Sequence, residues 1–383
     1  MRLDPRIAII SDSVDNIDGV AIGLRRLVAA SNRAGHAMTL IGPTPNGSNP
    51  PPDDVVRIPA AMSAALPIYP QYTWSVPELP ALTTHLARTA DVVQLATPGP
   101  MGLAGLIAGR MLGLPVLAQY HTEVPEYAAR LTGLPFVKDL VGPFVGWFYQ
   151  QADLCLAPSS AVADRLVSLG VPVARVCRVR RGVDLALFDP ARRDRSMLAR
   201  YGISAAAPLA LYVGRLSREK NLDALRTAWL AVHAERPDAR LLVVGEGPQS
   251  TGLDGPGVVR TGALHGTELA TVFASADVFA FASETETFGN VVVEAAASGL
   301  PAVVASVGAA HEHVVDGETG IVANGAPGFA RAISALLGDP QRRARMATAA
   351  RERARGYDLE AAVAATWSIY RDVAALARAK VAS

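Results

Sequence analysis

The chain has 383 residues, more than the roughly 250–300 at which one hydrophobic core usually stops growing, so we expect two domains. Half of the residues are apolar, 19% are charged and the formal net charge is +1, which argues against a polyanion such as nucleic acid as the main partner. The two cysteines, Cys155 and Cys177, lie in apolar surroundings and are predicted to be buried thiols rather than a disulfide or a metal pair.

The N-terminal apolar run is short and is broken by Asp12, which is unlike a signal peptide. No stretch approaches the ~20 apolar residues that span a bilayer. We therefore expect a cytoplasmic protein, and peripheral contact with the inner face of the membrane stays open.

The first half of the chain alternates short apolar strands with helical patterns. We predict a first helix at 21–35 and strands at 6–11, 37–43, 91–97, 115–122 and 153–159. Because these runs are apolar throughout rather than alternating, they are typical of strands buried on both faces of a parallel sheet. Residues 46–80 hold eight of the 27 prolines and predict a long irregular excursion or a set of short elements.

The second half repeats the pattern, with strands predicted at 209–215, 239–247, 258–264, 277–283 and 301–306. Two such halves predict an α/β protein with two doubly wound domains. Their boundary is expected near 180–196, where turn-forming and charged residues cluster. Since such sheets bind ligands beyond the carboxyl ends of their strands, functional residues are expected just after strands.

Two glutamates lie close together at a predicted strand-to-helix turn. Glu286 lies in the turn after the strand 277–283, and Glu294 lies one turn inside the helix that follows. A helix N-terminus offers free N–H groups and a partial positive charge, and Gly289 lets the backbone approach a phosphate or a hydroxyl-rich ligand. Alternatively, both carboxylates only stabilise the first turn, by about 0.3–1 kcal/mol each.

Other candidates also lie close to strands or helices. Arg215 and Lys220 follow the strand 209–215 and could neutralise a diphosphate, or they are two solvated surface cations. His121 follows an apolar strand and could donate to a sugar hydroxyl, although lone histidines are more often structural. Gly19 precedes the first helix, either to let a phosphate or sugar approach or as a simple loop glycine.

Several alternatives find little support in the sequence. The segment 243–250 misses the dinucleotide fingerprint because Ser250 stands at its third glycine, which argues against a nicotinamide cofactor. The histidines other than His121 form no metal-binding spacing, and His311 and His313 are expected on opposite faces of a strand. Residues 131–151 are apolar and aromatic, and could face lipid, but we favour a buried core helix.

Taken together, these segments resemble the large retaining glycosyltransferase family 4, the glycosyl transferases group 1, of the GT-B fold. The second-half matches are YVGRLSREKN, VVGEGP, ADVFAFASETETFGNVVVEAAASGLPAVV and GETGIV, and RRGVDLALFDP matches at the boundary. YHTEVPEYAARLTG and WFYQQADLCLAPSSAVADRL look like the branch that contains GDP-mannose-dependent α-mannosyltransferases and sulfoquinovosyl-diacylglycerol synthases. The resemblance covers nearly the whole chain.

The resemblance implies two doubly wound Rossmann-like domains that face each other across a cleft. Residues 1–185 would form the acceptor-side domain and residues 186–360 the nucleotide-sugar-binding domain. The final helix, within 361–383, would pack back on the first domain.

The resemblance also implies roles in the second domain. Arg215 and Lys220 would hold the donor diphosphate. Glu294 would bind the ribose and Glu286, a catalytic residue, the hydroxyls of the donor sugar. The main-chain N–H groups of Phe288, Gly289, Asn290 and Val291 would contact the sugar and the phosphate. Gly262 and Leu264 would flank the base.

In the first domain, His121 would be the second catalytic residue and would contact the transferred sugar near its reacting carbon. Gly19 would approach the β-phosphate. The family usually has two glycines in this loop, whereas this sequence reads Asp18-Gly19-Val20. The sequence therefore departs from the family pattern at the β-phosphate contact.

The implied reaction transfers a hexose from a nucleoside-diphosphate sugar with retention at the anomeric carbon. We favour mannose from GDP-mannose and a lipid or small glycoside acceptor; the alternative is a UDP-sugar and a natural-product or polysaccharide acceptor. Since Arg215, Lys220 and a helix N-terminus can neutralise the leaving diphosphate, and no Asp-x-Asp pair follows a strand, we expect no metal and no other cofactor. The competing classes are a GT-B-fold epimerase or phosphorylase and a non-catalytic sugar-nucleotide-binding protein.

Overall fold

The structure, a computed structural model, describes residues 4–15, 19–44, 54–66, 69–249 and 252–382. The chain forms two compact units, one of Met1–Arg181 with Glu360–Ser383 and one of Gly182–Leu359. The division between Arg181 and Gly182 lies a few residues before the boundary expected after residue 185. Each unit has its own hydrophobic core.

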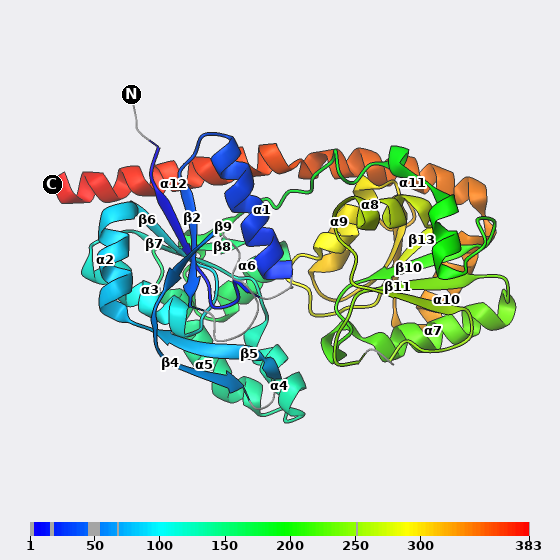
Figure 1. Cartoon of the computed structure of the whole chain (residues 1–383), viewed down its shortest axis with the longest axis horizontal. Coiled ribbons are helices and arrows are strands. Elements are labelled where there is room, and N and C mark those ends of the chain that lie inside the picture. Colours follow the sequence, from blue (N-terminus) through cyan, green and yellow to red (C-terminus); the bar gives the residue numbers. More distant parts are fainter. Residues whose placement is uncertain (1–3, 16–18, 45–53, 67–68, 250–251, 383) are drawn as a thin grey trace. The chain divides into compact units, whose positions relative to one another are not determined.

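The first unit is built on a parallel sheet, drawn in blue to green in Figure 1. The strand order of this sheet is β3-β2-β1-β6-β7-β8-β9. Its strands are β1 (Ile7–Ile10), β2 (Met38–Pro43), β3 (Val55–Ile58), β6 (Val92–Leu95), β7 (Val116–Gln119), β8 (Leu154–Ala157) and β9 (Val176–Arg178). Every residue of β1, β6 and β7 is buried, as continuous apolar runs in a sheet covered on both faces require. The five strands predicted for this half are confirmed; the short edge strands β3 and β9 were not predicted.

Helices connect the strands of this unit. They are α1 (Gly19–Arg33), α2 (Leu79–Thr89), α3 (Pro100–Met111), α4 (Val124–Thr132), α5 (Val137–Gln150) and α6 (Ser160–Ser168). Gly19 is the first residue of α1, so the prediction that it lies in a loop before the helix is wrong. Asp18, next to it, lies outside the described residues.

The proline-rich segment 46–80 forms short elements over its described part. Besides β3 it contains an antiparallel pair, β4 (Ala60–Leu66) and β5 (Tyr69–Pro77). Met62 and Trp74 on this pair are exposed by 64% and 49%. The alternative of short elements is therefore the correct one where the structure describes the segment.

The second unit contains a six-stranded parallel sheet in the order β12-β11-β10-β13-β14-β15. Figure 1 labels three neighbouring strands of this sheet, β11, β10 and β13. The strands are β10 (Leu209–Val213), β11 (Arg240–Val244), β12 (Val258–Gly262), β13 (Val278–Phe281), β14 (Ala302–Ala305) and β15 (Gly320–Ala323). The helices are α7 (Leu222–Glu235), α8 (Gly266–Ser275), α9 (Asn290–Ala297), α10 (Gly325–Gly338) and α11 (Pro340–Ala354). The five strands predicted for this half are confirmed.

Both sheets reverse their strand order at one point. In the first unit this switch lies between β1 and β6, and in the second between β10 and β13. Ligands of doubly wound sheets bind at the carboxyl ends of the strands beside such a switch. The polar residues that directly follow these strands are therefore the candidates for ligand binding and catalysis.

The segment 131–151 differs from the buried core helix that was expected. Phe136, Leu140, Phe144 and Trp147 are exposed by 61%, 73%, 43% and 45%. Phe136 directly precedes helix α5, which carries the other three exposed residues; the buried residues of α5 are Val145, Gly146, Phe148 and Tyr149. The prediction is wrong for one face of the helix, because hydrophobicity along the whole segment does not reveal which face a neighbour covers.

The last helix, α12 (Leu359–Ala382), packs on the first unit. Trp367 and Tyr370 are buried; the indole N–H donates to Ser31 Oγ at 3.0 Å and the phenol donates to Gln94 Oε1 at 2.5 Å. Arg371 pairs with Asp4 at 2.6 Å. Over the described residues, no helix combines the length and hydropathy needed to cross a bilayer.

Both cysteines are free thiols. Cys155 in β8 is buried, and burial raises the pKa of its thiol to about 12. Cys177 was also expected to be buried, but it is partly exposed because β9 is the edge strand of its sheet.

Candidate functional site

The residues after β10 and β13 meet because these two strands are parallel neighbours at the switch point. Lys220 lies in the short 3-10 helix η4 (Arg218–Lys220), and its Nζ is 2.5 Å from Glu286 Oε1. The two side chains are only 19% and 15% exposed. Ser283 Oγ donates to the same Glu286 oxygen at 2.7 Å. Two of the predicted site residues thus form a largely buried, hydrogen-bonded ion pair.

The loops that carry this pair are bonded to each other. Thr285 Oγ1 donates to the carbonyl oxygen of Glu219 at 3.1 Å, and Asn221 Nδ2 donates to Glu284 Oε1 at 3.2 Å. Asn221 has a φ of 54°, which turns the chain from η4 into α7. These contacts fix the positions of Lys220 and Glu286 before any ligand arrives.

Arg215 lies two residues after β10, and its main-chain oxygen accepts a hydrogen bond from Tyr212 Oη at 2.9 Å. The neighbouring loop after β11 approaches this segment backbone to backbone. A β-carbon at Gly245 would lie 2.0 Å from the carbonyl oxygen of Gly214, so only glycine fits there. The glycines of VVGEGP therefore serve to pack this loop beside Arg215.

The start of α9 contains the next group of predicted residues. Gly289 precedes the helix with a φ of 88°, a left-handed conformation that favours glycine, and Asn290 and Val291 are the first two helical residues. Glu294 lies one turn further and is 6% exposed. The first N–H groups of a helix have no partner within the helix, and they carry partial positive charge. This end of α9 is suited to an anionic group.

His313 holds the backbone at the start of α9 by a hydrogen bond to Phe288, a role that was not predicted from the sequence. Its Nε2–H donates to the carbonyl oxygen of Phe288 at 2.6 Å, and the hydroxyl of Tyr357 donates to its Nδ1 at 2.9 Å. The rings of Phe288 and His313 pack edge to face with centroids 4.3 Å apart. Burial lowers the pKa of His313 to about 4, so the imidazole is neutral near neutral pH.

The prediction that His311 and His313 point to opposite faces of a strand is wrong. The segment is a 3-10 helix, η5 (Ala309–His313), which follows β14. The one sequence signal for His313 was its place shortly after an apolar strand. Its partners, Phe288 and Tyr357, are remote in the sequence, so no local pattern reveals them.

Gly262 and Leu264 lie at the end of β12. The carbonyl oxygen of Gly262 accepts from the N–H of Gly245 at 2.8 Å, and Leu264 is partly buried against the core. Glu246, which was not predicted, approaches the same segment: its Oε1 accepts from the Ala263 N–H at 3.5 Å. The carboxyl edge of this sheet therefore brings together the loops after β10, β11, β12 and β13.

In the first unit, His121 follows β7 and is buried, with 7% exposure. The guanidinium of Arg181 donates to its Nδ1. Burial first, and the positive charge of Arg181 second, hold the pKa of His121 well below its usual value. His121 is thus a neutral imidazole at the carboxyl edge of its sheet.

Asp12 is a buried carboxylate at the same edge, beside the switch point. Its oxygens accept from the Met101 N–H at 2.8 Å and from Thr97 Oγ1 at 2.5 Å, which ties the start of α3 to the end of β1. Burial raises its pKa to about 6. Sequence reasoning treated Asp12 only as a break in an apolar run, although a polar residue directly after a buried strand was the signal.

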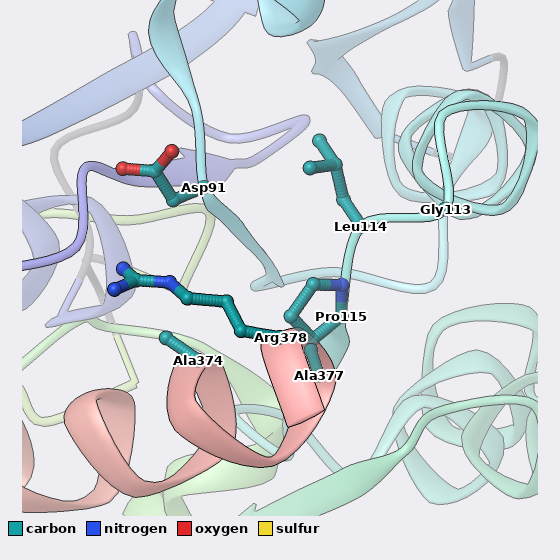
Figure 2. A pocket seen from close by; sticks show the side chains of 7 residues that line it. All are labelled: Asp91, Gly113, Leu114, Pro115, Ala374, Ala377 and Arg378. Atoms are coloured by element: carbon teal, nitrogen blue, oxygen red, sulfur yellow. The ribbon is translucent and has the colours of Figure 1, made fainter. Parts of the chain in front are cut away.

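A pocket of about 330 Å³ lies elsewhere in the first unit, at the amino ends of β6 and β7 (Figure 2). It is lined by Asp91, the turn 113–115 and the α12 residues Ala374, Ala377 and Arg378. The carboxylate of Asp91 pairs with Arg6 at 3.0 Å. Because His121 and Asp12 lie at the opposite, carboxyl edge of the same parallel sheet, this pocket is separate from the candidate site.

No group of three or more His, Cys, Asp or Glu side chains in the described part of the chain has the arrangement of a metal site.

Comparison with known proteins decides the family. The family described as Glycosyl transferases group 1 matches residues 207–339, and Glycosyltransferase Family 4 matches residues 17–187. A GDP-mannose-dependent alpha-mannosyltransferase of Mycobacterium tuberculosis is 34% identical over 323 residues, which cover 83% of each chain. The chain belongs to glycosyltransferase family 4. The sulfoquinovosyl transferase SQD2 of Arabidopsis thaliana is also 34% identical, over 80% of this chain and 61% of the plant protein.

Solved structures place the family 4 chain in the GT-B fold. Sucrose-phosphate synthase from Thermosynechococcus elongatus superposes with a TM-score of 0.77 at 23% identity, covering 97% of this chain and 99% of that one. The lipopolysaccharide glycosyltransferase WaaG gives 0.71 at 17% identity, covering 95% and 99%. The two units are therefore the two Rossmann-like domains of a GT-B fold. The family models and the curated relatives, not these structures, show that the chain is a glycosyltransferase of the hexosyltransferase type.

Proposed function

We propose that the chain transfers mannose from GDP-mannose to a lipid or small glycoside acceptor, with retention at the anomeric carbon and without a metal. The observation that carries the proposal is the buried Lys220–Glu286 pair, held at the switch point of a family 4 nucleotide-sugar domain. Relatives named GDP-mannose-dependent alpha-mannosyltransferase, 34% and 33% identical over most of the chain, support the choice of donor.

The second unit binds the donor in this proposal. The leaving group is a nucleoside diphosphate, whose developing negative charge must be neutralised by fixed positive groups. Arg215, Lys220 and the N–H groups at the start of α9 supply this charge, and Gly289 lets the phosphate approach. Glu294 accepts hydrogen bonds from the ribose hydroxyls.

Glu286 is the proposed contact for the donor sugar. In the donor-free protein its carboxylate is bonded to Lys220 and Ser283. When the diphosphate binds, Lys220 turns toward the phosphate, while Ser283 keeps the carboxylate in place to accept from sugar hydroxyls. Gly262 and Leu264 flank the base.

The proposal assigns two residues of the first unit to the same reaction. His121 contacts the transferred sugar near its reacting carbon, and its neutral imidazole can donate a hydrogen bond there. Gly19, as the first residue of α1, offers a backbone N–H to a phosphate oxygen.

Thermal shift measurements with four donors test the proposal. We expect GDP-mannose to raise the melting temperature more than UDP-glucose, UDP-galactose or UDP-N-acetylglucosamine, because binding stabilises the folded state by mass action. GDP and GMP, measured alongside, form a matched pair that differs in the second phosphate. GMP should raise the melting temperature less than GDP. A shift with a UDP-sugar and none with GDP-mannose would replace the proposed donor, and binding of GDP-mannose without transfer or donor hydrolysis would favour a non-catalytic binding protein.

The same transfer assay after treatment with EDTA tests the absence of a metal requirement. Activity should persist without added cation, since protein cations neutralise the leaving diphosphate. Activity that is lost on chelation and restored by magnesium or manganese would contradict this part of the proposal.

The outer face of α5 supports an apolar acceptor. Leu140 and Trp147 are exposed by 73% and 45%, and such a face can lie at a membrane surface where a lipid acceptor resides. We expect the chain to float with liposomes and the double variant Leu140→Ser, Trp147→Ser to lose this binding. Leu376→Ser, at a residue of α12 that is 66% exposed, is the control and should float like the wild type. No flotation of the wild type at low salt would argue against membrane contact.

A further inference from the structure

Arg181 reaches His121 across the carboxyl edge of the first sheet. Arg181 follows β9 and His121 follows β7, and β8 lies between these two strands. The guanidinium group nevertheless contacts the imidazole at Nδ1. Glu123 is the acidic residue nearest to His121 along the chain, but its carboxylate has other partners. It accepts from Tyr120 Oη at 2.8 Å and lies 3.3 Å from Arg165 Nε.

The chemistry of the two side chains fixes the direction of the contact. A guanidinium has five N–H donors, carries no acceptor and keeps its charge at all ordinary pH values. The imidazole nitrogen that it meets must therefore be the acceptor, with a free lone pair. A neutral imidazole has one protonated nitrogen, so the proton of His121 resides on Nε2.

We propose that Arg181 is a positioning residue that holds His121 as a neutral imidazole with its proton on Nε2. This inference deepens the proposed function, because it specifies what His121 can do there. Nδ1 is occupied as an acceptor, and Nε2–H is a hydrogen-bond donor. His121 therefore donates to an oxygen of the donor substrate and does not serve as a general base.

Burial and charge act together in this arrangement. His121 is 7% exposed, and a second positive charge beside Arg181 in a buried place would be strongly unfavourable. Burial first, and the charge of Arg181 second, disfavour the doubly protonated form, and the guanidinium contact at Nδ1 excludes the Nδ1–H tautomer. An uncharged donor next to a sugar whose anomeric carbon becomes positively charged avoids repulsion in the transition state.

Nitrogen NMR of the protein labelled with ¹⁵N-histidine tests this inference without any substrate. The signal of His121 is assigned from its disappearance in His121→Gln. In the wild type we expect Nδ1 to resonate as an unprotonated nitrogen and Nε2 as a protonated one, at neutral pH and on acidification below the usual pKa of a histidine. In Arg181→Met both nitrogens should shift toward tautomer-averaged values, and the ring should take up a proton at higher pH.

Two further variants serve as controls. Arg181→Lys keeps a charged donor and should restore much of the wild-type spectrum, whereas Arg180→Met removes an adjacent exposed arginine and should leave it unchanged. Unchanged signals of the other six histidines show that a variant is folded. In transfer assays, Arg181→Met should lower kcat by at least about tenfold with little change in donor KM.

A wild-type spectrum with the proton on Nδ1, or with a charged ring near neutral pH, would overturn the inference. So would an Arg181→Met spectrum identical to that of the wild type. Since the spectra are recorded without donor, they are independent of the donor's identity: failure of GDP-mannose as substrate would refute the proposed function and leave the Arg181–His121 inference intact.

Discussion

Replacing Lys220 with methionine should lower turnover by about 10²–10³-fold, the usual effect of removing one group that stabilises developing charge. Lys220 is held 2.5 Å from Glu286 in a largely buried place, so its charge is little screened by solvent. Methionine keeps the length and the apolar stem of lysine but supplies no charge to the diphosphate. A steady-state transfer assay at saturating donor measures the loss.

The adjacent Arg218 provides the matched control. It lies on the same 3-10 helix η4 and is exposed, so Arg218→Met removes a positive charge of the same loop outside the pair. We expect this variant to keep turnover within about threefold of the wild type, as surface charges contribute little. Equal losses in both variants would show that net charge, and not the placement of Lys220, matters.

Glu286 must be considered with Lys220, because removal of one partner leaves the other charge buried. In the wild type Ser283 Oγ donates to Glu286 at 2.7 Å, and we expect this bond to persist in Lys220→Met, which limits this penalty. The melting temperature of the variant therefore separates loss of folding from loss of catalysis. A folded Lys220→Met protein with wild-type turnover would contradict the role of the pair.

The second large effect concerns acid stability and His313. In the folded protein burial lowers the pKa of His313 to about 4, whereas its value before burial is 6.5. Between these values the unfolded chain binds a proton that the folded chain does not. The contribution of the neutral, buried His313 to the free energy of unfolding is therefore complete above pH 6.5 and is lost as the pH falls toward 4.

The size of this effect follows from linkage. A shift of two to three pKa units corresponds to roughly 3 kcal/mol between the two ends of the window. Asp12 acts in the opposite direction: burial raises its pKa to about 6, so the folded chain holds a proton more tightly, and this favours folding at lower pH. His121, whose pKa burial also lowers, acts in the same direction as His313, so the pH profile of the wild type alone mixes at least these three contributions.

Comparing the pH dependence of stability in the wild type and in His313→Gln isolates the contribution of His313. Glutamine has an N–H donor for the Phe288 oxygen but does not titrate, and Asp12 is the same in both proteins. Urea unfolding at neutral pH and at about pH 5 should show that the wild type loses more stability than the variant on acidification. Parallel losses in the two proteins would show that His313 is not a buried neutral base.

The two Rossmann-like sheets could be predicted from the sequence because their strands are continuous apolar runs. The edge strands β3, β9 and β15 were missed since they are short, and β9 is only partly buried. The outer face of α5 was misjudged because hydrophobicity does not tell whether a neighbouring element covers a face. Leu140 and Trp147 have no such cover within the described unit and stay exposed.

The residues of the candidate site could be predicted one by one, but the contacts between them could not. Lys220 and Glu286 were each singled out by their place after a strand, and their pairing depends on the adjacency of β10 and β13, which two strands separate in the sequence. His313 and Arg181 act through partners far along the chain. Such residues carry no local pattern, so geometry alone reveals them.

The most direct test of the central claim is an experimental structure of the chain with GDP-mannose or GDP bound. The account predicts that the diphosphate contacts Lys220, Arg215 and the first N–H groups of α9, with the ribose on Glu294 and Lys220 turned away from Glu286. A diphosphate bound elsewhere, with the Lys220–Glu286 pair intact and the start of α9 unoccupied, would contradict it.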